Sequence, residues 1–342
     1  MIDFSKLDET LISPNVQNKK FQPHLVNLEI PLMNDPKEIP IEDTNSVDID
    51  PLNVKSFPIV SDLTSNKSVI AIDSTAMRLG TIDDGIIGVI RLSVIRRNAG
   101  ERSHYLDKYG PKMVVITNQN RDDIYKNLFH KVYGKHLSGS LIPENLKVLD
   151  RVRNLYERYI QSEIVKSNED SIILFDGSLI GGTVDNPKFF IEDILKNAKM
   201  NRNIVVSISK NTNLTLKHNK RSILSLIENN SNSIFLGPIN NKIEQNSERY
   251  LGDIHVCRLI ENGHPFRIDI PKDSAIESNE LFGLLSALSG PYGYPEELKF
   301  AHSTCVHSSI EILALQALAI HEHKMQIEEN LRNMIFAPFI TG

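Results

Sequence analysis

The chain has 342 residues, of which 40% are hydrophobic and 24% are charged. This composition is typical of a globular protein and excludes a wholly disordered or collagen-like chain. The 38 Lys and Arg residues against 43 Asp and Glu residues give a net charge of −5, which excludes a protein that coats nucleic acid by charge alone. Any contact with nucleic acid is therefore expected in a groove or in a brief catalytic encounter.

The sequence predicts a cytoplasmic protein that does not contact a membrane. Its longest strongly apolar stretch, about ten residues ending at Ile320, is too short to cross a bilayer. Residues 1–4 lack the basic and apolar segments of a signal peptide. The two cysteines, Cys257 and Cys305, are too few for a disulfide framework or a cysteine-based zinc site. Both are therefore expected to be free thiols in a reducing compartment.

Residues 1–67 differ in composition from the rest of the chain, because they contain seven of the 16 prolines and no glycine. Proline fixes φ and favours an extended residue before it. We therefore expect a stiff arm that packs on the body or on a second subunit; a poorly ordered leader is the alternative. At the other end, residues 331–342 form an apolar tail that includes Phe336 and Phe339.

The body of the chain begins at Val69 and alternates β-branched runs with segments of helical periodicity. The predicted strands lie at 69–73, 85–95, 103–109, 171–175, 203–208, 254–260 and 266–270. The predicted helices lie at 121–133, 143–166, 187–199, 278–288 and 296–330. Short links between the first three strands favour an antiparallel meander, whereas the helix between 171–175 and 203–208 favours parallel pairing.

This order resembles the ribonuclease H-like fold. That fold is an α/β fold with a mixed sheet, in which three antiparallel strands are followed by parallel strands joined by crossover helices. Here C-terminal helices are added, and the domain is expected to span residues 68–330.

Two acidic residues follow predicted strands. Asp73 ends the run 69–73, before the turn-like Ser74 and Thr75, and Asp176 follows the strand 171–175. If these strands are neighbours, both carboxylates project from the edge of the sheet where open α/β sheets bind ligands. Close carboxylates repel each other unless a divalent cation compensates. The alternative is that they are two unrelated strand ends.

A third carboxylate can be placed by length along the helix 143–166. If the chain reverses after this helix, Asp176 lies roughly 17 Å along the returning strand. Glu157 lies roughly 14 Å back along the helix, whereas Glu163 lies only about 5 Å back and Asp150 about 24 Å. Glu157 therefore fits best by level, although Glu163 lies nearer the centre of the apolar stripe. A solvated glutamate on the helix surface is the alternative for Glu157.

Tyr294 and His302 belong to one module, Gly290-Pro-Tyr-Gly-Tyr-Pro-Glu-Glu-Leu-Lys-Phe-Ala-His302. Pro295 is a suitable first residue of a helix, which places His302 two turns into it. A histidine beside carboxylates is a candidate metal ligand or proton-transfer group. A packing role is the alternative.

Taken in order, these elements resemble the NurA nuclease family. The resemblance is carried by Asp73 in Val-Ile-Ala-Ile-Asp-Ser, Asp176 in Leu-Phe-Asp-Gly-Ser-Leu, the strand 205–210, and Tyr294 with His302. It extends over roughly residues 65–325 of a chain with the size of a short archaeal member. The chain has Asp73-Ser74-Thr75 where the family usually has Asp-Gly-Ser.

The resemblance implies a DNA nuclease that depends on Mn²⁺ or Mg²⁺. On this hypothesis Asp73, Glu157, Asp176 and His302 form the metal site, and two ions activate a water and stabilise the leaving oxygen. Tyr294 would position DNA or the attacking water, and Lys210 would hold a phosphate. Further DNA contacts would come from Arg96, Arg97, Lys217, Lys220 and Arg221. Solvated surface side chains are the alternative for these basic residues.

The resemblance also implies a homodimer that works with a hexameric HerA-type DNA translocase in the resection of double-strand-break ends. The expected activities are an exonuclease on single- and double-stranded DNA, acting 5′ to 3′, and a single-strand endonuclease. Two other hypotheses stay open. An ATPase of the actin/hexokinase type would need glycine-rich phosphate loops, for which only Gly181 and Gly182 qualify. A non-catalytic adaptor of a translocase would not need the polar site residues.

Overall fold

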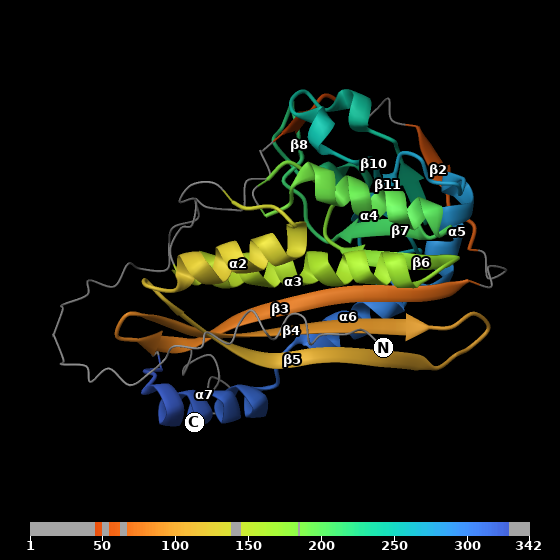
Figure 1. Cartoon of the computed structure of the whole chain (residues 1–342). Coiled ribbons are helices and arrows are strands. Elements are labelled where there is room, and N and C mark those ends of the chain that lie inside the picture. The colour runs from red at the N-terminus through yellow and green to blue at the C-terminus, as the bar shows by residue number, and fades with distance from the viewer. Residues whose placement is uncertain (1–44, 50–54, 62–66, 138–144, 184, 328–342) are drawn as a thin grey trace, which may run out of the picture.

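The computed structural model describes residues 45–49, 55–61, 67–137, 145–183 and 185–327. Within this part of the chain, nine strands form one large mixed sheet in the order β2-β9-β10-β11-β7-β6-β3-β4-β5 (Figure 1). Its strands are β2 (Ser56–Pro58), β3 (Ser68–Ile82), β4 (Gly85–Arg97), β5 (His104–Thr117), β6 (Ser171–Asp176), β7 (Ile204–Ser209), β9 (Ile234–Leu236), β10 (Gly252–Arg258) and β11 (Phe266–Pro271).

The five strands from β5 to β7 have the ribonuclease H-like arrangement. β3, β4 and β5 form an antiparallel meander, and β6 and β7 add to β3 in parallel. This confirms the predicted fold class. Beyond β7 the sheet continues with the antiparallel strands β11, β10, β9 and β2.

Helices cover both faces of the sheet (Figure 1). One face packs against α2 (Arg121–Tyr133), α3 (Asn145–Ser167) and α4 (Lys188–Met200). The opposite face packs against α5 (Ser278–Ala287) and α6 (Glu296–Cys305). Since strand side chains alternate between faces, each strand of the centre contributes to two cores.

The first and third strands are longer than predicted. β3 continues nine residues past Asp73, to Ile82, so that Ser74 and Thr75 lie inside the strand and the predicted turn is wrong. The reason is the β-branched partner strand β4, which pairs with β3 as far as Ile82 opposite Gly85. β5 likewise runs to Thr117; it accommodates Pro111 because it is an edge strand with an irregularity in its pairing.

The single C-terminal helix predicted at 296–330 is two helices. Val306 has extended backbone angles after α6, and Ser308 starts α7 (Ser309–His323) through a capping box with Glu311. By length and composition alone the stretch Glu296–His323 would be able to cross a membrane. The break at Val306 divides it into two helices that both pack against β3, and each is shorter than the about 20 residues a span needs.

Parts of the proline-rich segment 1–67 belong to sheets. Ser56–Pro58 forms the edge strand β2, and Ser46–Val47 forms β1, which pairs in parallel with β8 (Thr215–Leu216). Asn45 donates a hydrogen bond to the Tyr250 hydroxyl. Most of the predicted arm and the whole tail 331–342 lie outside the described residues.

Candidate metal centre

Two carboxylates meet on the α6 side of the sheet. Ile72 of β3 lies opposite Phe175 of β6 in the parallel register, so the next residues, Asp73 and Asp176, lie side by side. Asp176 is the last residue of β6, as predicted, whereas Asp73 lies within β3. Gly177 follows Asp176 with φ +110°, a conformation that favours glycine and allows the chain to turn away from the sheet.

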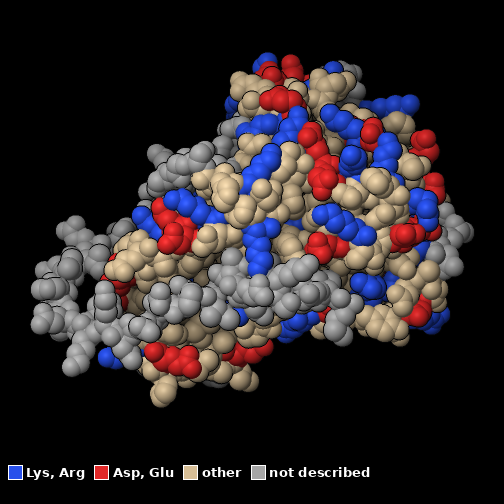
Figure 2. Space-filling view, in the orientation of Figure 1, with Lys and Arg blue, Asp and Glu red and all other residues tan. Residues whose placement is uncertain are grey.

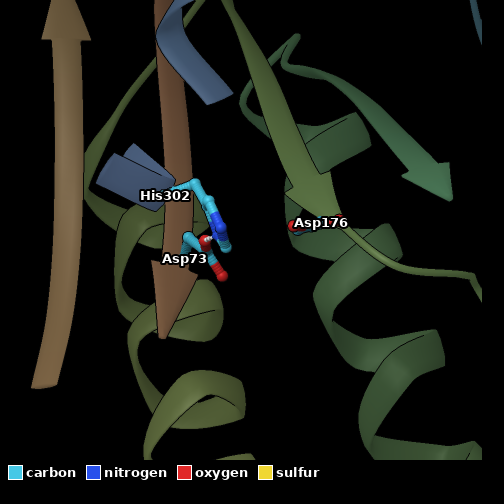
Figure 3. Close-up of side chains that lie close together, drawn as sticks. All are labelled: Asp73, Asp176 and His302. Atoms are coloured by element: carbon cyan, nitrogen blue, oxygen red, sulfur yellow. Dashed lines mark hydrogen bonds and ion pairs between the residues drawn. The ribbon is translucent and has the colours of Figure 1, made fainter. Parts of the chain in front are cut away.

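His302 completes a group of three possible metal ligands. It lies on α6, and its Nδ1 is 2.8 Å from Oδ2 of Asp73. One ligand atom from each of Asp73, Asp176 and His302 lies within 4.8 Å of the other two. Figure 3 shows His302 reaching over β3 to Asp73, with Asp176 at the end of the adjoining strand. Two carboxylates and an imidazole that converge in this way are suitable ligands for a divalent cation.

The electrostatics of the site favour a cation. The pKa of Asp73 is raised from 3.8 to about 6, first by burial and then by the charges of Asp176 and Glu157. Hydrogen bonds from His302 and from the backbone of Ser74 oppose this effect. Ionisation of Asp73 is costly because the residue is buried and because two further carboxylates, Asp176 and Glu157, lie nearby. A bound cation would stabilise the ionised form of Asp73. The residues present therefore fit a divalent metal ion.

Glu157 lies beside this group but does not belong to it. Its carboxylate accepts hydrogen bonds from the Ser74 hydroxyl, from Arg153 at 3.0 Å and from Gln161 at 3.1 Å. Its charge acts on Asp73. The length argument set Glu157 level with Asp176, and in the structure its carboxylate contacts Ser74 of the neighbouring strand β3. Glu163 lies six positions further along α3 and is only partly buried.

Tyr294 is partly buried, and its hydroxyl oxygen lies inside the fold. Burial raises the pKa of its hydroxyl, and the charges of Asp176 and Asp73 raise it further. The hydroxyl oxygen makes no well-aligned hydrogen bond with any described residue. Helix α6 begins at Glu296, where the predicted helix 296–330 begins, with Pro295 at the N-cap. This places His302 two turns into the helix.

Of the predicted DNA-contacting residues, only Lys210 reaches the centre. Its Nζ lies 2.8 Å from Oδ2 of Asp176. Arg97 instead binds Glu297 with a distance of 2.6 Å, and the neighbouring Arg96 is partly buried on the other face of β4. Among the other basic residues, Lys217 pairs with Glu244 and Arg221 with Glu228.

The space-filling view shows a face of mixed charge. Figure 2 shows Lys and Arg side chains interspersed with Asp and Glu over the described part of this face. A uniformly positive surface is not seen there.

Two further features of the site were not predicted. The Cys305 thiol on α6 donates a hydrogen bond to the Asp73 carbonyl at 3.0 Å, which ties the helix of His302 to β3. Arg267 and Asp269 form a fully buried ion pair on β11, and Asp269 accepts a hydrogen bond from the backbone of Leu179, three residues after Asp176. The only sequence signal for this pair was two opposite charges on the same face of an otherwise apolar strand.

Comparison with known proteins identifies the family. The NurA domain model matches residues 67–306. The chain belongs to the NurA family. The resemblance inferred from the motifs is thereby confirmed, and the protein is a nuclease. This membership favours hydrolysis of nucleic acid over the actin/hexokinase-type ATPase.

Solved structures similar to the chain include two NurA proteins and an endonuclease V. The NurA nuclease from Sulfolobus solfataricus is 15% identical, with 79% of this chain and 88% of that chain covered and a TM-score of 0.49. A structure of NurA with manganese is 10% identical, with 78% and 91% covered and a TM-score of 0.40. Endonuclease V from Ciona intestinalis, in complex with an inosine-containing DNA, is 13% identical, with 72% and 90% covered and a TM-score of 0.37. No curated protein matches the chain.

Proposed function

We propose that this NurA-family protein is a metal-dependent deoxyribonuclease that hydrolyses phosphodiester bonds with Mn²⁺ or Mg²⁺. The observation that carries the proposal is the convergence of Asp73, Asp176 and His302 within 4.8 Å. Burial and the neighbouring charges raise the pKa of Asp73 to about 6. Such a site gains stability from a divalent cation, and metal-assisted hydrolysis of phosphodiesters uses sites of this kind.

The residues take separate roles in this proposal. Asp73, Asp176 and His302 would hold the ion, which when bound supplies positive charge for the phosphate and acidifies a water. Glu157 holds Ser74 and Arg153 on the adjoining side of β3 and adds negative charge near Asp73. The hydroxyl of Tyr294, buried beside Asp176, would donate a hydrogen bond to the attacking water or to the DNA.

The finer activities follow the family resemblance. They are exonuclease cleavage of single- and double-stranded DNA in the 5′ to 3′ direction and endonuclease cleavage of single strands, during resection of double-strand-break ends. The proposed location is the cytoplasm, in accord with two unpaired cysteines. The alternative hypothesis, a non-catalytic adaptor of a translocase, predicts that the protein has the same fold but does not cleave DNA with any metal.

DNA labelled at the 5′ or the 3′ end tests the activity. The protein is incubated with single- and double-stranded substrates in Mn²⁺, Mg²⁺ or EDTA. We expect cleavage with either metal, none with EDTA, and release of the 5′ label as short products. Binding of the DNA without cleavage in any metal would support the adaptor instead.

We further propose that the protein forms a homodimer and binds a hexameric HerA-type translocase. Exposed apolar side chains on α7 support a partner surface; Ile310 is 80% exposed, and Leu313 and Leu318 lie on the same helix.

The role of the N-terminal arm, residues 1–67, in the homodimer is tested by sedimentation of a chain that lacks residues 1–44, because this truncation keeps β1, β2 and Asn45. We expect the dimer to be lost; an unchanged dimer that still binds the translocase would reject a role for the arm.

A further inference from the structure

Two tyrosines that are two positions apart in the chain have different environments. Tyr294 is partly buried, and the charge of Asp176 acts on its hydroxyl. Tyr292, in contrast, is 65% exposed. Because two residues of chain span at most about 7 Å, the exposed ring of Tyr292 lies close to the proposed metal centre.

The rings of both tyrosines contact rings of a second segment. Tyr294 packs against Phe266 with centroids 5.4 Å apart. Tyr292 stacks with His264, with centroids 6.2 Å apart and ring planes inclined by 21°. His264 is exposed like Tyr292, so this second pair of rings faces solvent. The two segments therefore present one stacked pair of rings at the surface, next to the pair that includes Tyr294.

Backbone contacts hold the exposed pair in place. The Tyr292 carbonyl accepts a hydrogen bond from the His264 backbone at 3.0 Å, and the Gly293 backbone donates to the Gly290 carbonyl at 2.9 Å. Gly293 has φ +77°, a conformation that favours glycine. A Cβ atom at Gly263 would lie 3.2 Å from the Tyr292 carbonyl oxygen, so the two segments approach closely. Since the backbone is already fixed, the exposed ring loses little conformational freedom when it binds a ligand.

A positive charge lies beside the exposed ring. Lys299 is exposed on α6, and its Nζ is 6.0 Å from the centroid of the Tyr292 ring. Residues three apart on a helix are neighbours on its surface, so Lys299 lies one turn before the proposed metal ligand His302. The side chain of His302 is itself 56% exposed. An aromatic face next to a positive charge is the combination that binds single-stranded nucleic acid.

We propose that Tyr292, His264 and Lys299 form a binding subsite for an unpaired nucleotide of the DNA strand whose phosphodiester lies at the metal centre. The base stacks on the Tyr292 ring, and the Lys299 ammonium donates to an adjacent phosphate. Stacking accepts any base, since every base has a π face. In the interior of a duplex both faces of a base are already stacked, so the subsite selects single strands and frayed ends. This inference rests on the proposed nuclease activity.

The first test measures binding of a fluorescently labelled single strand of DNA by anisotropy, in EDTA to prevent metal-dependent cleavage. Tyr292→Leu removes the ring, and we expect it to weaken binding about 5- to 100-fold. Tyr292→Phe keeps the ring and should bind within about two-fold of the wild type. Tyr105→Leu is the matched control, because Tyr105 is 52% exposed and lies on the α3 face of β5 with Tyr109. Equal affinities of Tyr292→Leu and Tyr105→Leu would overturn the inference.

The second test separates the bases from the phosphates. A strand of the same length that consists only of abasic sites keeps every phosphate and lacks every base. With this strand Tyr292→Leu should bind within about two-fold of the wild type, because the ring has no base on which to stack. An equal loss of affinity for the abasic and the normal strand would show that Tyr292 does not bind a base, and would overturn the inference.

The contact of Lys299 with a phosphate is tested by the dependence of binding on salt. Lys299→Met should lower the slope of log Kd against log salt concentration by about 0.7 for a single strand. Lys199→Met is the control, because Lys199 pairs with Asp273 at the surface. A slope for Lys299→Met equal to that of the control would overturn the phosphate contact.

Cleavage in Mn²⁺ distinguishes this inference from the proposed activity. Tyr292→Leu should raise KM for a single strand more than KM for a blunt duplex, with kcat nearly unchanged. Equal changes of KM for the two substrates would overturn the inference and leave the nuclease proposal standing. A wild type that binds single strands through Tyr292 but cleaves no DNA with any metal would contradict the nuclease proposal and support the subsite alone.

Discussion

The imidazole of His302 lies 2.8 Å from the carboxylate of Asp73, although 229 positions separate these residues in the sequence. The contact joins α6 to the central strand β3, and the Cys305 thiol reinforces it by donating to the Asp73 carbonyl. The site is therefore assembled from the first strand of the domain and one of its last helices. Loss of either element would separate the ligands.

Neutralising a ligand should abolish cleavage without unfolding the protein. Asp73→Asn, Asp176→Asn and His302→Ala would each remove a proposed metal ligand, so we expect activity to fall by about 100- to 1,000-fold or more. High Mn²⁺ should partly restore His302→Ala. The measurement is the initial cleavage rate, with Asp123→Asn as control because Asp123 is exposed on α2. Near-normal turnover by either aspartate variant at saturating Mn²⁺ would contradict the metal site.

Asp73→Asn should stabilise the metal-free protein at neutral pH. Burial raises the pKa of Asp73 from 3.8 to about 6, so the folded state holds this proton more tightly than the unfolded state. The resulting stability is present below about pH 4 and is lost as pH rises through about 6. This difference in pKa corresponds to about 3 kcal/mol. Above about pH 7 we expect the free energy of unfolding of Asp73→Asn to be higher than that of the wild type by up to that amount. Below about pH 4 we expect the two free energies of unfolding to be equal.

Urea denaturation in EDTA across this pH range measures the effect. A stability difference that does not change with pH would show that burial does not perturb Asp73. Addition of Mn²⁺ at neutral pH should stabilise the wild type more than the variant, because the ion binds the folded site.

Glu157→Gln should reduce cleavage far more than Glu163→Gln. The Glu157 carboxylate binds Arg153 and Ser74 next to Asp73, and loss of its charge leaves the guanidinium unpaired at the site. We expect a loss of about 10- to 100-fold, as for residues that orient metal ligands. Glu163→Gln should stay within about two-fold. An inactive Glu163→Gln and an active Glu157→Gln would show that the helix carries its third carboxylate elsewhere.

Tyr294→Phe separates the hydroxyl from the ring. The ring packs near Phe266 with centroids 5.4 Å apart and lies under Lys210, and the substitution keeps both contacts. The hydroxyl is buried beside Asp176. We expect kcat to fall about 100-fold or more with unchanged thermal stability, since removal of one hydrogen-bond donor from a reaction centre costs about 100- to 1,000-fold. Wild-type kcat in the variant would assign Tyr294 to packing alone.

Breaking the buried ion pair of β11 should destabilise the protein strongly. Arg267→Met leaves the Asp269 charge buried without its partner, which costs about 3 to 5 kcal/mol. Arg202→Met is the control, because its pair with Glu169 is about 70% exposed on both sides and such pairs contribute roughly 0 to 1 kcal/mol. Chemical denaturation measures both variants. Equal losses of stability in the two would show that burial of Arg267 has no energetic consequence.

The sequence by itself determined the features that depend on local pattern. The bounds of α2, the strands β6 and β7, and the position of Asp176 at a strand end follow from periodicity and β-branched composition, which act over a few residues. The order of these elements was enough to predict the ribonuclease H-like sheet. Four motifs in sequence were enough to indicate the NurA family.

Only the tertiary structure decided the features that depend on distant partners. β3 extends past Asp73 because β4 pairs with it, and no local signal in Ser74 or Thr75 reveals this. The Glu157 carboxylate accepts hydrogen bonds from Arg153, Ser74 and Gln161. Its level along α3 was predictable from the sequence, but these contacts were not. The pairing of Lys210 with Asp176 likewise depends on strand order, because hydrogen bonds and ion pairs form between groups that the fold, and not the sequence, brings within 3 Å.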